Sequence, residues 1–304
     1  MTSSLSLRRR TVRFGSLRSP VRFVGCDDLL DAVRTILRGW DVVEAEPDDA
    51  APPVIRVRRT TEGYRRVSCW TDRPSRVRAK LRRTLVEALC GFHAEFLDWY
   101  VEAHPDTLFV HGAAVAYGRR LVVFPAIAHA GKSTLTVHLA AAGRRVFCDD
   151  VLPIDTTTRR GLALGIVPRL RPPLPANVSD AFRRFVAARA GHGYRNRLYV
   201  TLRGRELAPL GASAPIGGIV LLDRRPTGRA ELAPVDPADA LETIILQNFA
   251  RDVPAGKILD TLEHVVRTAR CHRLRYSRTS DAVARLDDAF GRAKSAPAPR
   301  RRAP

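Results

Sequence analysis

The chain has 304 residues, of which 45% are hydrophobic and 27% charged, a balance typical of a folded protein with a sizeable core. Its net charge of +20 comes almost entirely from arginine and is accompanied by no RNA-recognition, KH or zinc-finger pattern, so specific nucleic-acid recognition is not favoured. The cysteines are scattered and odd in number, which argues against a disulfide framework. No apolar run approaches the ~20 residues of a membrane span and no secretory signal is found, so we expect a cytoplasmic protein that does not contact a membrane.

The N-terminal third predicts a small α+β region over residues 20–105, after a basic, disordered tail at 1–19. VRFVG and DVVEA predict strands on either side of the helical segment DDLLDAVRTIL. VIRVRR and YRRVSCW alternate around the turn TEG and predict a β-hairpin. Residues 77–104 carry Leu81, Leu85, Leu89, Phe92 and Phe96 near helical spacing, which predicts one long helix.

The remainder predicts an α/β domain over residues 106–291, followed by a disordered Ala/Pro/Arg tail at 292–304. Strands are predicted, in order, at LFVHGAAVAY, LVVF, RRVFCDD, VLPID, GLALGIVP, LYVTLRG, IGGIVLLDR and CHRLRYS. Helices are predicted at GKSTLTVHLAAAG, SDAFRRFVAARA, DPADALETIILQNF, PAGKILDTLEHVVRTA and TSDAVARLDDAF. The proline-rich stretch PRLRPPLP is predicted to be extended.

The stretch from Ala126 to Thr134 lies between the apolar strand LVVF and a helix, and it resembles a P-loop. In a P-loop, backbone N–H groups and the helix N-terminus bind phosphates, a lysine neutralises them, and a hydroxyl binds Mg²⁺. Gly131, Lys132, Ser133 and Thr134 fit that pattern, and Ala130 completes the phosphate-binding loop. A chance G-K-S-T at a helix start is the competing interpretation.

Two residues depart from the P-loop pattern. Ala126 stands where the first glycine belongs, and alanine has no easy access to left-handed backbone conformations. His129 places an imidazole over the expected phosphate position, where it would add a donor or crowd the ligand. We expect both to belong to the nucleotide-binding segment.

An acidic pair and a histidine flank the loop in sequence. Asp149 and Asp150 end a predicted strand, where one carboxylate can bind metal while the other accepts a proton. A solvated turn is the alternative for this pair. His111 precedes Gly112 in the strand before the loop, and a core histidine is the alternative there.

The combination of HGAAV, LVVFPAIAHAGKSTL and RRVFCDDVLPI resembles the HPr kinase/phosphorylase family, including related peptide-tailoring serine kinases. The resemblance implies a P-loop core like that of HPr kinase and phosphoenolpyruvate carboxykinase, with ATP or GTP and Mg²⁺ as cofactors. It implies that Asp149 is the catalytic base, tuned by His111, that Lys132 binds the phosphates, and that Ser133 and Asp150 bind the metal. The family's downstream E-I-R-G signature is missing from this chain.

The implied activity is transfer of the γ-phosphoryl group to a serine or threonine hydroxyl of a peptide, small protein or metabolite, and a biosynthetic precursor peptide is one candidate. Related kinases assemble as homo-oligomers. Two other functions compete: a catalytically weak nucleotide-binding regulator with a degenerate P-loop, favoured by Ala126 and His129, and a basic nucleic-acid-binding protein in which GKST is incidental.

Overall fold

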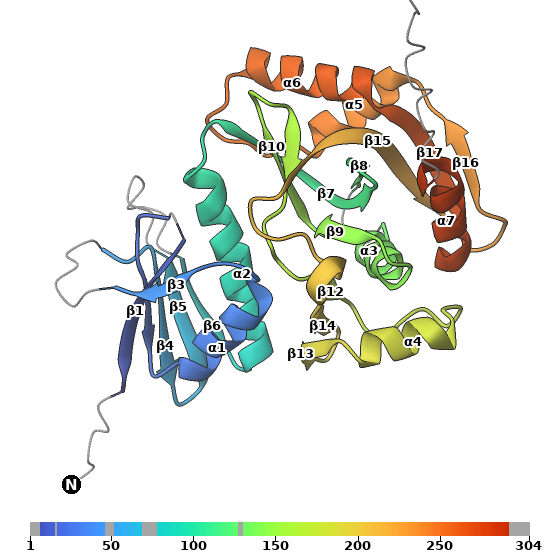
Figure 1. The fold of residues 1–304 in the computed structure, drawn as a ribbon. Coiled ribbons are helices and arrows are strands. Elements are labelled where there is room, and N and C mark those ends of the chain that lie inside the picture. Colours follow the sequence, from blue (N-terminus) through green and yellow to red (C-terminus); the bar gives the residue numbers. More distant parts are fainter. Residues whose placement is uncertain (1–6, 16, 46–51, 69–77, 127–129, 292–304) are drawn as a thin grey trace, which may run out of the picture.

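The computed structural model describes residues 7–15, 17–45, 52–68, 78–126 and 130–291, and within them the fold is mixed α/β (Figure 1). Three sheets are present among these residues: a six-stranded sheet near the N-terminus, an eight-stranded sheet, and a small three-stranded sheet between them. None of the described helices is both long and apolar enough to cross a membrane.

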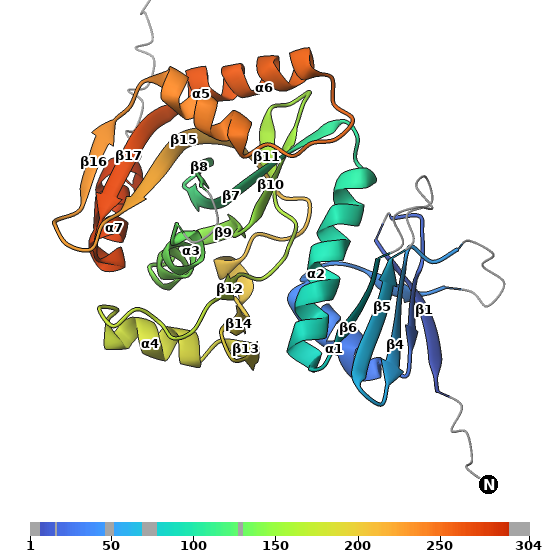
Figure 2. The ribbon, with the colours of Figure 1, turned by 180° about the vertical axis from the view of Figure 1, so that it is seen from behind.

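The six-stranded sheet has the order β3-β1-β2-β4-β5-β6. Its strands are β1 (Arg9–Phe14), β2 (Val21–Val24), β3 (Val42–Glu44), β4 (Ile55–Thr60), β5 (Gly63–Ser68) and β6 (Arg78–Arg82). Helices α1 (Asp27–Ile36) and α2 (Leu85–Glu102) pack together on one face of this sheet (Figures 1 and 2). Alternate strand residues such as Val12, Phe14 and Phe23 are buried against them, while the opposite face is open and rich in arginine.

The structure corrects two predictions in this region. Arg9–Phe14 was predicted to be disordered, but Val12 and Phe14 alternate with polar residues and are buried in β1, an interior strand of the sheet. The long helix predicted from residue 77 begins only at Leu85, because Thr84 and Glu87 form a capping box that starts α2 there. Leu81 lies in β6 and is 42% exposed.

The eight-stranded sheet has the order β11-β10-β7-β8-β15-β17-β16, and β9 pairs with β7 beside this path. Its strands are β7 (Thr107–Tyr117), β8 (Arg120–Pro125), β9 (Arg145–Cys148), β10 (Val151–Asp155), β11 (Arg160–Leu162), β15 (Ser213–Arg224), β16 (Glu231–Pro234) and β17 (Arg270–Tyr276). Strands β8, β15 and β17 are parallel, and β7 and β10 are antiparallel neighbours.

Helices cover both faces of the central strands, which explains why they are apolar along their whole length. The alternate residues Val122 and Phe124 of β8 belong to the core under α3 (Lys132–Ala141) and α7 (Thr279–Leu286). Leu121 and Val123 belong to the core under α5 (Pro237–Leu246) and α6 (Ala255–Thr268), on the other side of the sheet (Figure 2).

The small sheet connects the two larger parts of the molecule. It consists of β12 (Arg169–Leu170), β13 (Ala190–Tyr194) and β14 (Arg197–Val200), and β13 lies near α2. Ser179 caps α4 (Asp180–Ala187) as predicted, by accepting a hydrogen bond from the Phe182 N–H. Short helical turns at Gly204–Glu206 and Asp287–Gly291 complete the described chain.

Candidate functional site

The site is built around the N-terminus of α3, directly after β8. Gly131 precedes the helix with φ of +90°, a conformation that side chains rarely adopt. A Cβ at this position would also lie only 2.9 Å from the Tyr276 hydroxyl of β17. Glycine is therefore required at this turn by both the backbone conformation and the neighbouring strand.

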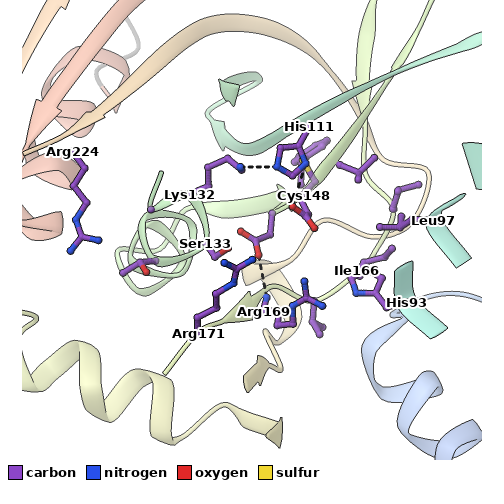
Figure 3. A pocket seen from close by; sticks show the side chains of 18 of the residues that line it. His93, Leu97, His111, Lys132, Ser133, Cys148, Ile166, Arg169, Arg171 and Arg224 are labelled. Carbon is purple, nitrogen blue, oxygen red and sulfur yellow. Dashed lines mark hydrogen bonds and ion pairs between the residues drawn. The ribbon is translucent and has the colours of Figure 1, made fainter. Parts of the chain in front are cut away.

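The first turn of α3 lines a cavity of about 340 Å³, which we call the central cavity (Figure 3). Gly131, Lys132, Ser133 and Thr134 all contribute to its wall. The N–H groups of the first helical turn have no partner within the helix, so the positive end of α3 borders this space.

Ala126 directly follows β8 and is buried. The described non-glycine residues with positive φ are Arg159 and Arg195, so Ala126 does not hold the left-handed conformation that favours glycine. Its carbonyl accepts a hydrogen bond of 2.6 Å from Lys132 Nζ. Ala130 lies beside Gly131, and His129 falls outside the described residues.

Lys132 and His111 contact one another across the central cavity. Lys132 Nζ lies 3.0 Å from His111 Nε2. Burial lowers the pKa of His111, and the nearby Lys132 ammonium lowers it further, so the imidazole is neutral near pH 7. Nε2 then accepts the hydrogen bond from Lys132, which assigns the ring proton to Nδ1, 3.5 Å from Asp150 Oδ1.

Burial also lowers the pKa of Lys132, while Asp150 and Asp149 raise it and Arg171 lowers it. The lysine is thus a partly desolvated cation held near two carboxylates. Such a cation interacts strongly with an added anion because the surrounding medium screens it less than water does.

Asp149 follows β9, and its side chain is oriented by the backbone of β12. The Arg169 N–H donates to Asp149 Oδ2 at 3.1 Å, whereas Oδ1 is shielded from solvent and has no hydrogen-bond partner among the described residues. Burial raises the pKa of Asp149 to about 6, and the adjacent Asp150 adds to this rise. The Arg169 N–H and the Ser133 hydroxyl oppose it.

Asp150 points a different way, as expected for consecutive residues at a strand end. Its side chain is 45% exposed and lies beside His111 at the cavity wall. Its carbonyl accepts a hydrogen bond from the Gly112 N–H at 3.1 Å, which ties the turn after β9 to β7. One carboxylate is therefore buried beside Ser133, and the other is open to the cavity.

Three arginines that the sequence analysis did not single out also line the central cavity: Arg169, Arg171 and Arg224 (Figure 3). Arg169 and Arg171 come from the extended PRLRPPLP segment, and Arg224 ends β15. The R-x-R spacing was an available signal, because residues two apart in an extended segment share one side. The position of Arg224 could not be inferred, because nothing local links β15 to the loop.

The far wall of the cavity comes from α2, in the N-terminal α+β region. His93 contributes there, with Nδ1 3.3 Å from the Tyr199 hydroxyl. Burial lowers the pKa of His93 to about 4, and Arg169 adds to the effect. His93 is therefore a neutral wall residue rather than a charged one.

The residues fit a magnesium ion of the kind that is completed by a ligand's phosphates. No group of three or more His, Cys, Asp or Glu side chains among the described residues is arranged to hold a metal ion alone. Mg²⁺ usually needs only one or two carboxylates when phosphates and water supply its other ligands. The buried Asp149 carboxylate, which interacts with the Ser133 hydroxyl and whose Oδ1 accepts no hydrogen bond from the described residues, is an oxygen site of this type.

Comparison with known proteins adds no relative. No protein-family model matches the chain, and no curated protein matches it.

Proposed function

We propose that this protein is a Mg²⁺-dependent, HPr-kinase-like phosphotransferase that moves the γ-phosphoryl group of ATP or GTP to a serine or threonine hydroxyl. The observation that carries the proposal is the convergence of one helix N-terminus, one lysine, three arginines and two carboxylates on a single cavity. Phosphoryl-transfer sites use such groups to position a polyphosphate and its metal ion.

The cations define where the phosphates would lie. The N-terminus of α3 provides N–H donors, and Lys132 stands at its first turn. Arg171 and Arg224 come from β12 and β15 segments on other sides of the same cavity. Lys132 donates to the Ala126 carbonyl and contacts His111, and we propose that it exchanges the carbonyl for a phosphate oxygen when the nucleotide binds.

The geometry favours a division of labour between the aspartates that reverses the one implied by family resemblance. Asp149 lies beside Ser133 with a buried, unpartnered oxygen, which suits a metal ligand. Asp150 is exposed to the cavity and faces His111, which suits a base that must reach an incoming hydroxyl. A neutral His111 with its Nδ1 proton toward Asp150 orients that carboxylate.

The proposed reaction balances without a further reactant. The acceptor oxygen forms a bond to the γ-phosphorus while the bond from that phosphorus to the β–γ bridging oxygen breaks, leaving the nucleoside diphosphate. Asp150 takes the hydroxyl proton, and Lys132 with the arginines stabilises the charge on the phosphoryl oxygens. A bound Mg²⁺ would neutralise charge on the phosphates at Asp149 and Ser133.

The weakly active regulator is the second candidate, and one observation bears on it. Of its two supports, His129 lies outside the described residues, and Ala126 has no positive φ that would call for glycine. We therefore prefer the active enzyme. Cytoplasmic location and homo-oligomerisation remain predictions from the sequence and the family resemblance.

The test is thermal stabilisation of the full chain by Mg²⁺–ATP. We expect a shift in the unfolding temperature that rises with ATP concentration and is lost in Lys132→Ala, because a ligand stabilises only the state that binds it. Arg58→Ala is the matched control: it removes one cation from the open face of the six-stranded sheet and should leave the shift intact. Equal shifts in wild type and Lys132→Ala would refute the proposed site.

A further inference from the structure

A second cavity, of about 420 Å³, lies between α2 and the small sheet, and we call it the basic cavity. Its described lining contains six cationic side chains and two acidic ones. The cationic residues are Arg66, Lys80, Arg82, Arg169, Arg171 and Arg197. Arg169 and Arg171 also line the central cavity, so the two spaces share a wall.

The two acidic residues offset only part of this charge, and both are held by structural contacts. Glu87 accepts hydrogen bonds from the backbone N–H groups of Arg83 and Thr84 at the start of α2. Glu95 forms a buried ion pair with Arg66 at 2.7 Å, and each side chain is only 6% exposed. With the Arg66–Glu95 pair set aside, five cationic side chains and one acidic one line the cavity, which favours an anionic ligand.

Unpartnered polar atoms line the same cavity and indicate more than a simple anion. Arg82 Nε is shielded from solvent and has no hydrogen-bond partner among the described residues. Glu95 Oε2, on a side chain more than nine-tenths buried, also has none. A buried polar atom of this kind requires a partner from a ligand or from water. A peptide can supply both, because its carboxylates accept from Arg82 and its N–H or O–H groups donate to Glu95.

We propose that the basic cavity binds an acidic segment of the acceptor peptide, and that Arg169 and Arg171 lie where this segment passes into the central cavity. The inference rests on the proposed phosphotransfer and specifies its substrate: a hydroxyl-bearing peptide with Asp or Glu close to the modified residue. The N-terminal α+β region then selects the acceptor, since α2, β5 and β6 supply most of the cavity.

The test is binding of a fluorescein-labelled peptide of alternating Glu and Ser, followed by fluorescence anisotropy with the full chain. Lys80→Glu/Arg197→Glu reverses two charges at the basic cavity. Arg56→Glu/Arg58→Glu makes the same charge change on the open face of the six-stranded sheet. We expect at least roughly tenfold weaker binding in the first variant and less than about threefold in the second, since contacts, unlike net charge, are local. Equal losses, or no loss in either, would overturn the inference.

Two further measurements keep the outcome specific. Mg²⁺–ATP stabilisation is measured on every variant, so that loss of peptide binding with retained ATP binding separates this inference from the proposed nucleotide site. Peptide binding that is normal in a wild-type chain showing no ATP stabilisation would refute the nucleotide site alone.

Tighter binding of a single-stranded oligonucleotide than of the peptide, lost in Lys80→Glu/Arg197→Glu, would overturn the peptide assignment. Should the double variant unfold, Lys80→Gln/Arg197→Gln replaces it with the same expected order of effects.

Discussion

Two groups of cations in this molecule are similar in size but differ in arrangement. Arg9, Arg22, Arg56, Arg58 and Arg65 spread across the open face of the six-stranded sheet. Pairing places Arg22 opposite Arg56 and Arg58 opposite Arg65, and none of the five lines the central or the basic cavity. In the central cavity, Lys132, Arg169, Arg171 and Arg224 converge from different elements, with two carboxylates beside them.

The difference between the open face and the central cavity shows that positive charge alone does not make a binding site. The open face attracts anions in general, and salt weakens that attraction. The central cavity adds fixed geometry and a pair of carboxylates. A surface that only attracts anions would still do so without them. Substitutions that remove these added features therefore distinguish a catalytic site from a basic surface.

The largest effect is expected from the two carboxylates. Asp150→Asn should lower phosphotransfer roughly 10²- to 10⁴-fold with ATP binding retained, because it removes the proposed base. Asp149→Asn should instead raise the Mg²⁺ concentration needed for half-maximal transfer. Rates measured against Mg²⁺ concentration for both variants decide between these roles.

On a mere basic surface, removing either carboxylate would only strengthen anion binding. If Asp149→Asn abolished transfer at saturating Mg²⁺ while Asp150→Asn left it intact, the roles implied by the family resemblance would hold instead.

Gly131→Ala should weaken ATP binding about tenfold and destabilise the fold by about 1–2 kcal/mol, because left-handed backbone at an alanine costs this much and the new Cβ meets Tyr276. Gly143→Ala, at the other end of α3, is the matched control. Its φ is +83°, and nothing lies within 4 Å of an added Cβ. It should lose stability without losing ATP affinity, as measured by thermal unfolding and titration calorimetry. Equal ATP affinity in the two variants would argue against a ligand at Gly131.

Stability without Mg²⁺ should fall as pH rises from about 4 to about 6. Burial raises the pKa of Asp149 to about 6, whereas the unfolded chain ionises near 3.8. Between these values the native state keeps a proton that the unfolded state releases, so unfolding becomes easier with increasing pH. The loss is on the order of 1–3 kcal/mol and should be absent in Asp149→Asn. Denaturant unfolding at pH 4.5 and 7.5 measures it, and identical pH profiles for wild type and variant would count against a buried, unpaired Asp149.

The smallest effect is expected at Ala126. Ala126→Gly should change phosphotransfer less than about threefold and lower stability by about 0.4–1 kcal/mol through greater freedom of the unfolded chain. The basis is that Ala126 has no positive φ for a glycine to relieve. A tenfold gain in transfer rate would show that the alanine impairs the loop and would revive the weakly active regulator.

The part of the site that follows from sequence is the part carried by contiguous segments. The strand before the loop, the helix after Gly131 and the acidic pair after β9 were predicted, because each depends on local periodicity and turn chemistry. His111, Lys132, Ser133, Asp149 and Asp150 do line one cavity.

The rest depends on long-range packing. Arg224 reaches the loop only because β15 pairs in parallel with β8, and His93 only because α2 packs near the small sheet. Strand β1 was missed because Arg9, Arg10 and Arg13 masked the alternation of Val12 and Phe14. The basic composition of this segment therefore led to a prediction of disorder, whereas its pairing in the sheet shows that β1 is a strand.

The most direct test is calorimetric titration of the full chain with AMP, ADP and ATP in the presence of Mg²⁺. We expect affinity to increase with each added phosphate, by at least roughly tenfold from AMP to ATP, and this increase to vanish in Lys132→Ala but persist in Arg58→Ala. Equal affinity for the three nucleotides, or an increase that survives Lys132→Ala, would contradict a polyphosphate site at the start of α3.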